Sequence, residues 1–91
     1  MRRLFEWDEA KRHSNTAKHG LDFIEVIVAF DDPKAVFFPS ANGDAEEPRT
    51  LMVAAFEGRL VTIVFTFRGI KARLISARAA RPKERNRYER S

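Results

Sequence analysis

The pattern of apolar and polar positions divides the chain into a helical first third and a β-rich remainder. Residues 5–7, Phe-Glu-Trp, predict a short first strand, and Asp8 after them is a typical helix N-cap residue. The helix that Asp8 opens is expected to end at His19, because Gly20 suits the left-handed conformation found just after many helices.

A second helix start follows directly. Asp22 and Glu25 have the spacing of a capping box, in which the two residues cap each other's backbone N–H groups. The apolar run FIEVIVAF, residues 23–30, predicts a short and largely buried helix. The Asp31-Asp32-Pro33 turn is expected to stop it.

The hydrophobic period changes from that of a helix to that of a strand in the middle of the chain. AVFF, residues 35–38, predicts a short strand, and PSANGDAEEP, residues 39–48, predicts a loop. Two β-rich runs follow, residues 49–56 and 59–67, and Glu57-Gly58 between them predicts a tight hairpin.

The second β-rich run has a regular alternation, so its two faces can be assigned. One face is apolar and is expected to face the core; it carries Val61, Ile63, Phe65 and Phe67. The other face is mixed and is expected to be partly open; it carries Leu60, Thr62, Val64, Thr66 and Arg68.

The end of the chain completes the expected fold. A reversal at Arg68-Gly69 leads into a strand over residues 71–79, and Pro82 suits the first turn of a closing helix over residues 82–90. We therefore expect one domain, residues 1–91, of the α+β class. Its two N-terminal helices are expected to pack on one face of an antiparallel sheet, with a short C-terminal helix after the last strand.

The charge is divided unevenly along the chain. Residues 1–57 hold seven Lys and Arg against eleven Asp and Glu, a net charge of −4, whereas residues 58–91 hold ten against two, a net charge of +8. A fold that keeps the second part together will have one strongly positive face, as expected of a protein that meets phosphates. The alternative is that these charges only keep a small domain in solution.

The composition excludes several classes of protein. Without cysteines the chain has no disulfide framework and no thiolate metal site, which fits a reducing compartment. The start of the chain, MRRLFEWDEA, lacks the apolar run of a signal peptide, and no segment approaches the ~20 apolar residues of a membrane span. We therefore expect a cytoplasmic protein that does not enter the membrane.

No metal or other cofactor is predicted. His13 and His19 are six residues apart on the first helix and face different sides, and no phosphate-binding glycine loop or nucleophile elbow is present. The remaining chemistry needs only acid–base groups and charge stabilisation. Metal-independent cleavage of RNA is of this kind, because the 2′-hydroxyl is its own nucleophile.

Lys18 and His19 are the first candidates for such chemistry. They lie in the last turn of the first predicted helix, where the macrodipole favours cations and is expected to raise the pKa of His19. His19 is therefore a candidate acid or phosphate ligand. The alternative is that both residues only complement the helix dipole.

Three arginines of the last hairpin, Arg68, Arg73 and Arg78, are candidates for contacting phosphate. Arg73 and Arg78 are five residues apart, so they face opposite sides of a regular strand, and a β-bulge or a strand end is needed to bring both to one site. The alternative is that these are ordinary arginines of a strand edge or turn.

The closing helix places Glu84 and Tyr88 one turn apart, and Arg81 and Arg85 share a stripe with Tyr88. A tyrosine among arginines can stack on a base while the guanidinium groups hold phosphates. The alternative is a lattice of Glu–Arg pairs within the helix, with Tyr88 docked on the core.

Between Phe5 and Glu89 the chain contains, in this order, the motifs F-x-W-D-x-x-K, N-x-x-K-H-G, F-x-D-P, T-x-R and I-S-A-R-x-A followed by E-R-x-x-Y. Together they resemble the BrnT family, toxins of type II toxin–antitoxin pairs. The resemblance implies a RelE-like fold, metal-independent RNA cleavage that inhibits translation, and a DNA-binding BrnA antitoxin with which the toxin represses its own operon. We expect a monomer without the antitoxin and a hetero-oligomer with it.

The resemblance supplies positions, and the chemistry above suggests roles for them. The expected catalytic residues are His19, Arg68, Arg78, Glu84 and Tyr88. Among these, His19 and Tyr88 are expected as acid–base or positioning groups, and Arg68 and Arg78 on the scissile phosphate. The expected RNA-binding residues are Lys11, Lys18, Arg49, Arg73, Arg81 and Arg85.

The chain departs from the family pattern in two places. Ala54-Ala55 stand where such sequences commonly show Gly-Arg, and Phe67 stands where a polar residue is common. These departures fit a weak or altered nuclease. The second hypothesis is a binding module of the same fold with weak or no catalysis, which binds RNA or the antitoxin and acts in repression of the operon. The third is a structural subunit whose positive face meets an acidic protein. The antitoxin is expected to contact the exposed sheet and closing helix, or Phe37 and Phe38 in a possible edge strand.

Overall fold

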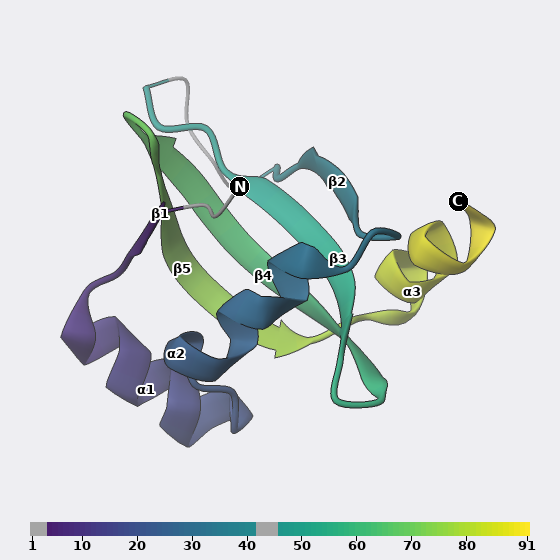
Figure 1. Ribbon diagram of the computed structural model, residues 1–91, viewed down its shortest axis with the longest axis horizontal. Helices are drawn as coiled ribbons and strands as arrows, with labels where there is room; N and C mark the ends of the chain where they lie inside the picture. Colours follow the sequence, from purple (N-terminus) through teal and green to yellow (C-terminus); the bar gives the residue numbers. More distant parts are fainter. Residues whose placement is uncertain (1–3, 42–45) are drawn as a thin grey trace.

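The computed structural model describes residues 4–41 and 46–91, which fold into a five-stranded sheet with helices before and after it (Figure 1). Residues 42–45 of the expected 39–48 loop lie outside this range. Along the chain the elements are β1 (Leu4–Glu6), α1 (Glu9–His19), α2 (Phe23–Val26), the 3₁₀ helix η1 (Ile27–Asp31), β2 (Val36–Pro39), β3 (Thr50–Phe56), β4 (Arg59–Arg68), β5 (Lys71–Ala79) and α3 (Pro82–Arg90).

Helix α1 has the bounds that its capping residues predict. The Asp8 side chain accepts a hydrogen bond of 2.8 Å from the backbone N–H of Ala10, and Gly20 follows the last turn with φ of 71°. The Gly20 N–H donates to the carbonyl of Thr16, which ends the helix in the left-handed manner.

The helix expected over residues 23–30 is divided. Its first turn is α2, capped by Asp22, and the remainder is the 3₁₀ helix η1. Four of the eight residues are β-branched and crowd the preceding turn of an α-helix, which accounts for the tighter second half. The expected burial is also only partial, because Ile24 and Val28 are 53% and 56% exposed.

The sheet is mixed, which corrects the prediction of an antiparallel sheet. Its strand order is β1-β5-β4-β3-β2, and β1 pairs parallel to β5, with Phe5 opposite Ala72. The other three pairs are antiparallel. A parallel pair requires a long connection, and here nearly the whole chain lies between the two strands.

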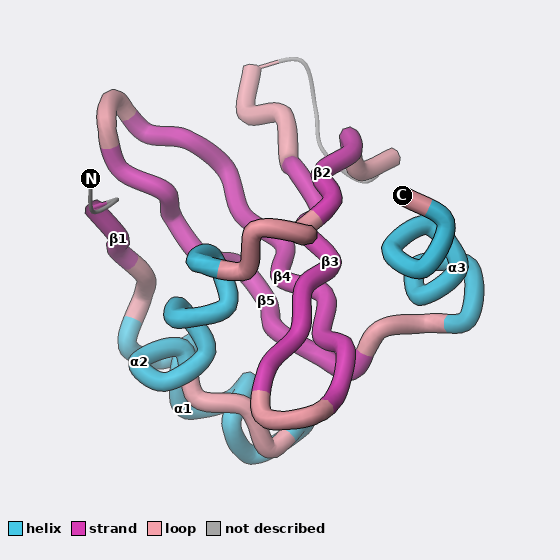
Figure 2. The backbone as a smooth tube through the Cα atoms, turned by 45° about the vertical axis from the view of Figure 1, so that its right-hand side comes forward, coloured by secondary structure: helices cyan, strands magenta, loops and turns pink. Residues whose placement is uncertain are grey.

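The main core lies between one sheet face and the segment from Leu21 to Ala29. Phe23 and Val26 are fully buried against Ile63 of β4 and its neighbours. Figure 2 shows α1 and α2 on one side of the strands and α3 on the other. Within the described residues, none of the helices combines the length and apolar character that a membrane crossing requires.

The two faces of β4 differ from the sequence-based assignment at one end. Phe67, expected in the core, is 53% exposed at the hairpin end of the strand. Thr62 and Thr66, expected on a partly open face, are 0% and 2% exposed. Thr62 is covered because its hydroxyl donates to Glu84 of α3, and Thr66 because its hydroxyl donates to the carbonyl of Pro48.

Candidate active site

Arg78 and Glu84 form a paired charge at the end of β5, where the chain turns into α3. The Nη1 and Nη2 atoms of Arg78 donate to the two carboxylate oxygens of Glu84, each over 2.8 Å. The same carboxylate accepts from the hydroxyl of Thr62 at 2.9 Å and from the backbone N–H of Arg81 at 2.8 Å. A bidentate pair of this kind has a fixed geometry, so Glu84 orients the guanidinium of Arg78.

Glu84 is held as a carboxylate despite its burial. Burial alone would raise its pKa, but the hydrogen bonds from Arg78, from the Arg81 N–H and from Thr62 lower the pKa of Glu84 from 4.5 to about 2. For Glu84, the alternative of pairs within α3 is therefore wrong, because its partner Arg78 lies on β5. A group that is deprotonated at neutral pH cannot act as an acid there.

Asn15 attaches the end of α1 to β5 beside Arg78. Its side-chain amide donates to the carbonyls of Leu21 and Ala77, both over 2.9 Å, and accepts from the Ala77 N–H at 3.0 Å. Asn15 is 7% exposed, and its polar atoms are satisfied by backbone groups. The last turn of α1, with Lys18 and His19, is thereby held against the strand that carries Arg78.

The pKa of His19 is lowered, which corrects the prediction that the helix dipole raises it. Partial burial is the main cause, and the positive charges of Lys18 and Arg78 add to it. Burial and the two positive charges thus act against protonation of the ring, opposite to the effect expected from the dipole of α1. His19 is therefore mostly neutral at pH 7 and can accept a proton.

Strand β5 contains a bulge, one of the two features that could bring its arginines to one face. Val64 pairs with Ser76 and Phe65 pairs with Leu74, so Ile75 is an extra residue. As a result Arg73 lies opposite Thr66 and Arg78 opposite Thr62, on the same face of the sheet.

The arginines of this face are nevertheless spread along the hairpin. Arg68 pairs with Lys71, six positions along β4 from the partner of Arg78, or about 20 Å at the rise of a strand. Arg68 is bound to Glu47 at 3.3 Å and Arg73 to Glu6 at 2.9 Å. The structure therefore does not bring Arg68 and Arg78 to one point.

Tyr88 lies one turn after Glu84 on α3 and contacts Asp32, after η1, rather than a residue of α1. Its hydroxyl donates to the Oδ2 atom of Asp32 over 2.8 Å, and that oxygen also accepts from the Ala55 N–H at 2.9 Å. The hydrogen bond to Asp32 raises the pKa of Tyr88, and burial adds to this. The contact attaches α3 to the loop after η1.

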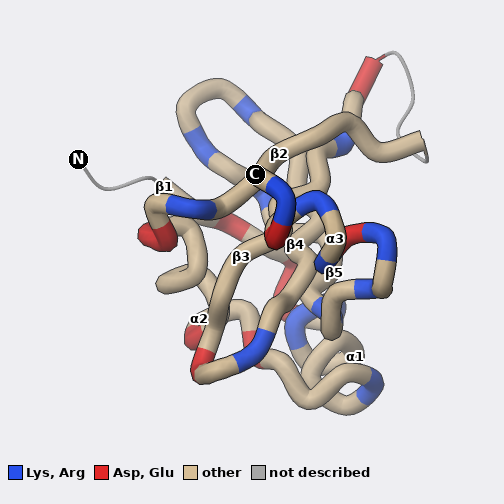
Figure 3. Tube along the Cα trace, turned by 90° about the vertical axis from the view of Figure 1, so that its right-hand side faces the viewer, with Lys and Arg blue, Asp and Glu red and all other residues tan. Residues whose placement is uncertain are grey.

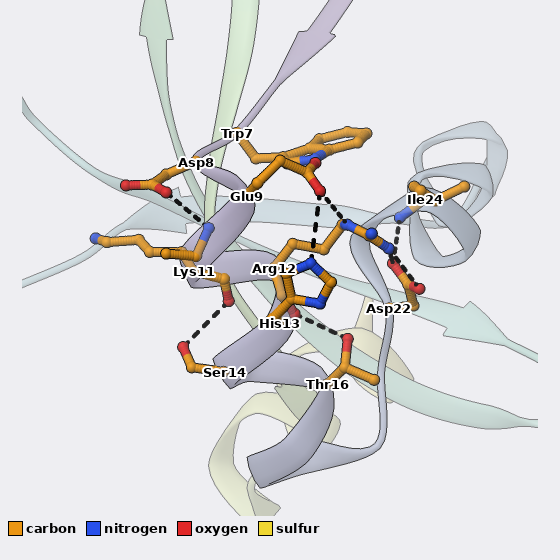
Figure 4. Close-up of polar contacts among 11 residues, drawn as sticks. Trp7, Asp8, Glu9, Lys11, Arg12, His13, Ser14, Thr16, Asp22 and Ile24 are labelled. Atoms are coloured by element: carbon orange, nitrogen blue, oxygen red, sulfur yellow. Dashed lines mark hydrogen bonds and ion pairs between the residues drawn. The ribbon is translucent and has the colours of Figure 1, made fainter.

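The remaining expected RNA-binding residues come from three separate parts of the chain. Lys11 is exposed on α1, two turns before Lys18, while Arg81, the N-cap residue of α3, and Arg85 on that helix are also exposed. Arg49 is partly buried just before β3. His13 lies on the other side of α1 beside Glu9 and Arg12 (Figure 4).

The sequence did not reveal the contacts of two residues that hold the fold together. Asn15 lies in the stretch N-x-x-K-H-G and Asp32 in F-x-D-P, but neither stretch indicates what the side chain contacts. In residues 4–41 and 46–91, no three His, Cys, Asp or Glu side chains are grouped as metal ligands would be.

Comparison with protein families identifies the chain. Residues 7–84 match the family model BrnT_toxin, described as the ribonuclease toxin, BrnT, of a type II toxin-antitoxin system. No curated protein matches the chain. The family match covers most of the sequence and includes the segments that carry His19, Arg78 and Glu84. The chain therefore belongs to the BrnT family of ribonuclease toxins of type II toxin–antitoxin systems.

Proposed function

We propose that this chain is a metal-independent endoribonuclease whose active site is the cluster of His19, Arg78 and Glu84. The observation that supports this most is geometric: Glu84 orients the guanidinium of Arg78 through two 2.8 Å hydrogen bonds, and Asn15 attaches α1, whose last turn carries His19, to Ala77 next to Arg78. A base and a fixed cation are two of the groups that RNA cleavage through the 2′-hydroxyl needs.

In the proposed reaction His19 takes the proton of the 2′-hydroxyl. The 2′-oxygen attacks the neighbouring phosphorus, the bond to the 5′-oxygen breaks, and the products are a 2′,3′-cyclic phosphate and a 5′-hydroxyl. Arg78 stabilises the charge that grows on the phosphate oxygens, and Glu84 acts as its positioning residue. Lys18, in the same turn as His19, is the proposed proton donor to the departing 5′-oxygen.

The other expected residues receive more distant parts in this proposal. Arg68 and Arg73 contact phosphates further along the RNA, because their strand positions are removed from Arg78. Lys11, Arg49, Arg81 and Arg85 add positive charge around the site and contribute to binding through the phosphates.

We propose that the cellular role is that of the family. The chain would cleave cellular RNA in the cytoplasm, inhibit translation, and be neutralised by a BrnA-type antitoxin. The α+β arrangement, with helices α1 and α2 near the start of the chain and α3 after the last strand, supports a RelE-like fold. Phe37 on the edge strand β2 is 49% exposed and supports the proposed antitoxin contact there.

The test of this function separates metal-free cleavage from the alternatives. A labelled single-stranded RNA is incubated with the purified chain in EDTA, beside the matched oligodeoxynucleotide, which lacks the 2′-hydroxyl. We expect fragments with 2′,3′-cyclic phosphate ends from the RNA and none from the DNA. Cleavage that requires added Mg²⁺ would contradict the mechanism.

A binding module without catalysis is the second candidate function. It is favoured by one observation, that two guanidinium nitrogens of Arg78 are already bound to Glu84. In that case the RNA would remain intact, with and without ribosomes, while still binding with a steep salt dependence.

The role of Tyr88 can be tested by removing its hydroxyl. Because this hydroxyl donates to Asp32, we expect Tyr88→Phe to lower the free energy of unfolding by about 1 kcal/mol and to leave the cleavage rate within a few-fold. Urea unfolding and the RNA assay would measure the two effects. A loss of cleavage in a variant of normal stability would show instead that Tyr88 is a catalytic residue.

A further inference from the structure

Two adjoining hollows form a groove between α3 and the sheet. The first, of about 590 Å³, is lined by Phe38, Arg81, Pro82, Lys83, Glu84 and Arg87. The second, of about 460 Å³, is lined by Val36, Phe37, Phe38, Arg87, Arg90 and Ser91. Phe38 and Arg87 line both hollows, so the two are continuous through this pair.

The groove is strongly positive. Its cations are Arg81, Lys83, Arg87 and Arg90, and Figure 3 shows basic positions along α3 near β2. The one acid among the lining residues is Glu84, whose charge is offset by Arg78. A chain of phosphates would therefore meet an uncompensated positive wall on the helix side.

The middle of the groove has an aromatic ring and a guanidinium stacked on each other. The Cζ atom of Arg87 lies 4.3 Å from the centre of the Phe38 ring. Flat surfaces of this kind bind unpaired bases, because every base has a π face that stacks on aromatic rings or guanidinium planes.

The sheet connects this pair to the proposed active site. Phe38 lies opposite Leu51, Leu51 opposite Val64, and Val64 opposite Ser76, in one row across four strands, and all four are partly exposed. The next row on the same face ends at Arg78. A single-stranded RNA lying on this face of the sheet could reach both Arg78 and Phe38.

We propose that the groove between α3 and β2 binds single-stranded RNA, with an unpaired base against Phe38 and Arg87. Lys83 and Arg90 hold the phosphates on either side of that base. This inference rests on the proposed function, since it makes the groove a subsite for the RNA that is cut at Arg78. RNA is favoured over an acidic protein because the stacked pair lines the same hollow as Arg81 and Glu84, and Glu84 is the partner of Arg78 at the proposed cleavage site.

Binding can be measured without cleavage by using a fluorescent single-stranded oligonucleotide with 2′-O-methyl riboses. We expect Phe38→Ala and Arg87→Ala each to weaken its binding about tenfold, the loss of one stacked base. Phe38→Trp keeps an aromatic face and is expected to bind as the wild type does. Arg90→Ala should lower the slope of log affinity against log salt by about 0.7, one phosphate contact.

Arg59→Ala is the matched control, because Arg59 is an exposed arginine at the β3–β4 hairpin and lines neither hollow. Equal weakening by Arg59→Ala and Arg87→Ala would overturn the inference and show unspecific attraction. Unchanged RNA affinity in Phe38→Ala, with loss of the complex with the antitoxin, would assign the groove to a protein instead.

The outcome is independent of whether the chain cleaves RNA. If wild type cuts RNA in EDTA but Phe38→Ala binds the 2′-O-methyl strand normally, the groove does not bind RNA and the proposed function is kept. If wild type cuts nothing but Phe38→Ala and Arg87→Ala lose binding while Phe38→Trp keeps it, the groove binds RNA and the proposed catalysis is wrong. Thermal unfolding of each variant shows whether the fold is kept.

Discussion

Replacing Glu84 with alanine is expected to lower the free energy of unfolding by about 3–5 kcal/mol, the cost of leaving one member of a buried ion pair without its partner. The side chain of Arg78 is only 15% exposed, and Thr62, whose hydroxyl also bonds the carboxylate, is 0% exposed. Chemical denaturation would measure the loss. Glu89→Ala is the matched control, because Glu89 is exposed on the same helix and its removal should change stability by less than about 0.5 kcal/mol.

The same carboxylate predicts how stability depends on pH. Its pKa is lowered in the folded chain from 4.5 to about 2, so its contribution is complete above pH 4.5 and is lost as the pH falls toward 2. A difference of this size corresponds to about 3 kcal/mol. Glu84→Gln should lack this part of the acid dependence. If wild type and Glu84→Gln lose stability in parallel between pH 5 and 2, the pair does not hold the carboxylate as described.

Replacing His19 with alanine is expected to slow RNA cleavage about 100- to 10,000-fold, the range typical of removing a general base. The reason is that His19 is neutral at pH 7, since burial and the charges of Lys18 and Arg78 lower its pKa. Single-turnover cleavage of labelled RNA would measure the rate. Binding of the 2′-O-methyl strand should change little, because the affinity depends on the surrounding arginines.

His13 provides the control for this experiment. It lies on the same helix, its side chain is 71% exposed, and its Nε2 atom is 3.8 Å from Glu9, on another side of α1. His13→Ala should cleave as the wild type does. The wild-type rate should also fall as the pH drops through the lowered pKa of His19, and His19→Ala should lose that limb of the profile. A fully active His19→Ala variant would show that His19 is not the general base.

Local sequence signals determined most of the elements. Asp8 and Gly20 bound α1 as predicted, because a side-chain cap and a left-handed glycine act within a few residues. Pro82 likewise starts α3 where its ring is tolerated, and the Glu57-Gly58 reversal joins β3 to β4. The family resemblance was also readable, since it depends on the order of short stretches along the chain.

The tertiary structure decided which of these residues meet. The parallel pairing of β1 with β5 joins the first and last strands of the chain, and no local pattern predicts such a pair. The bulge at Ile75 was required by the spacing of Arg73 and Arg78 only if both served one face. Once formed, it put them on that face but left them at different points along it.

The candidate site shows the same division between sequence and structure. His19, Arg78 and Glu84 could be chosen from the sequence as residue types, but their charges could not be assigned. The sequence predicted a raised pKa for His19 from the helix dipole, whereas in the fold, with α1 attached to β5 through Asn15, burial and the charges of Lys18 and Arg78 lower that pKa. Helix ends and turns follow from contacts between near neighbours in sequence, but a pKa depends on every charge within a few ångströms, and only the folded chain brings those charges together.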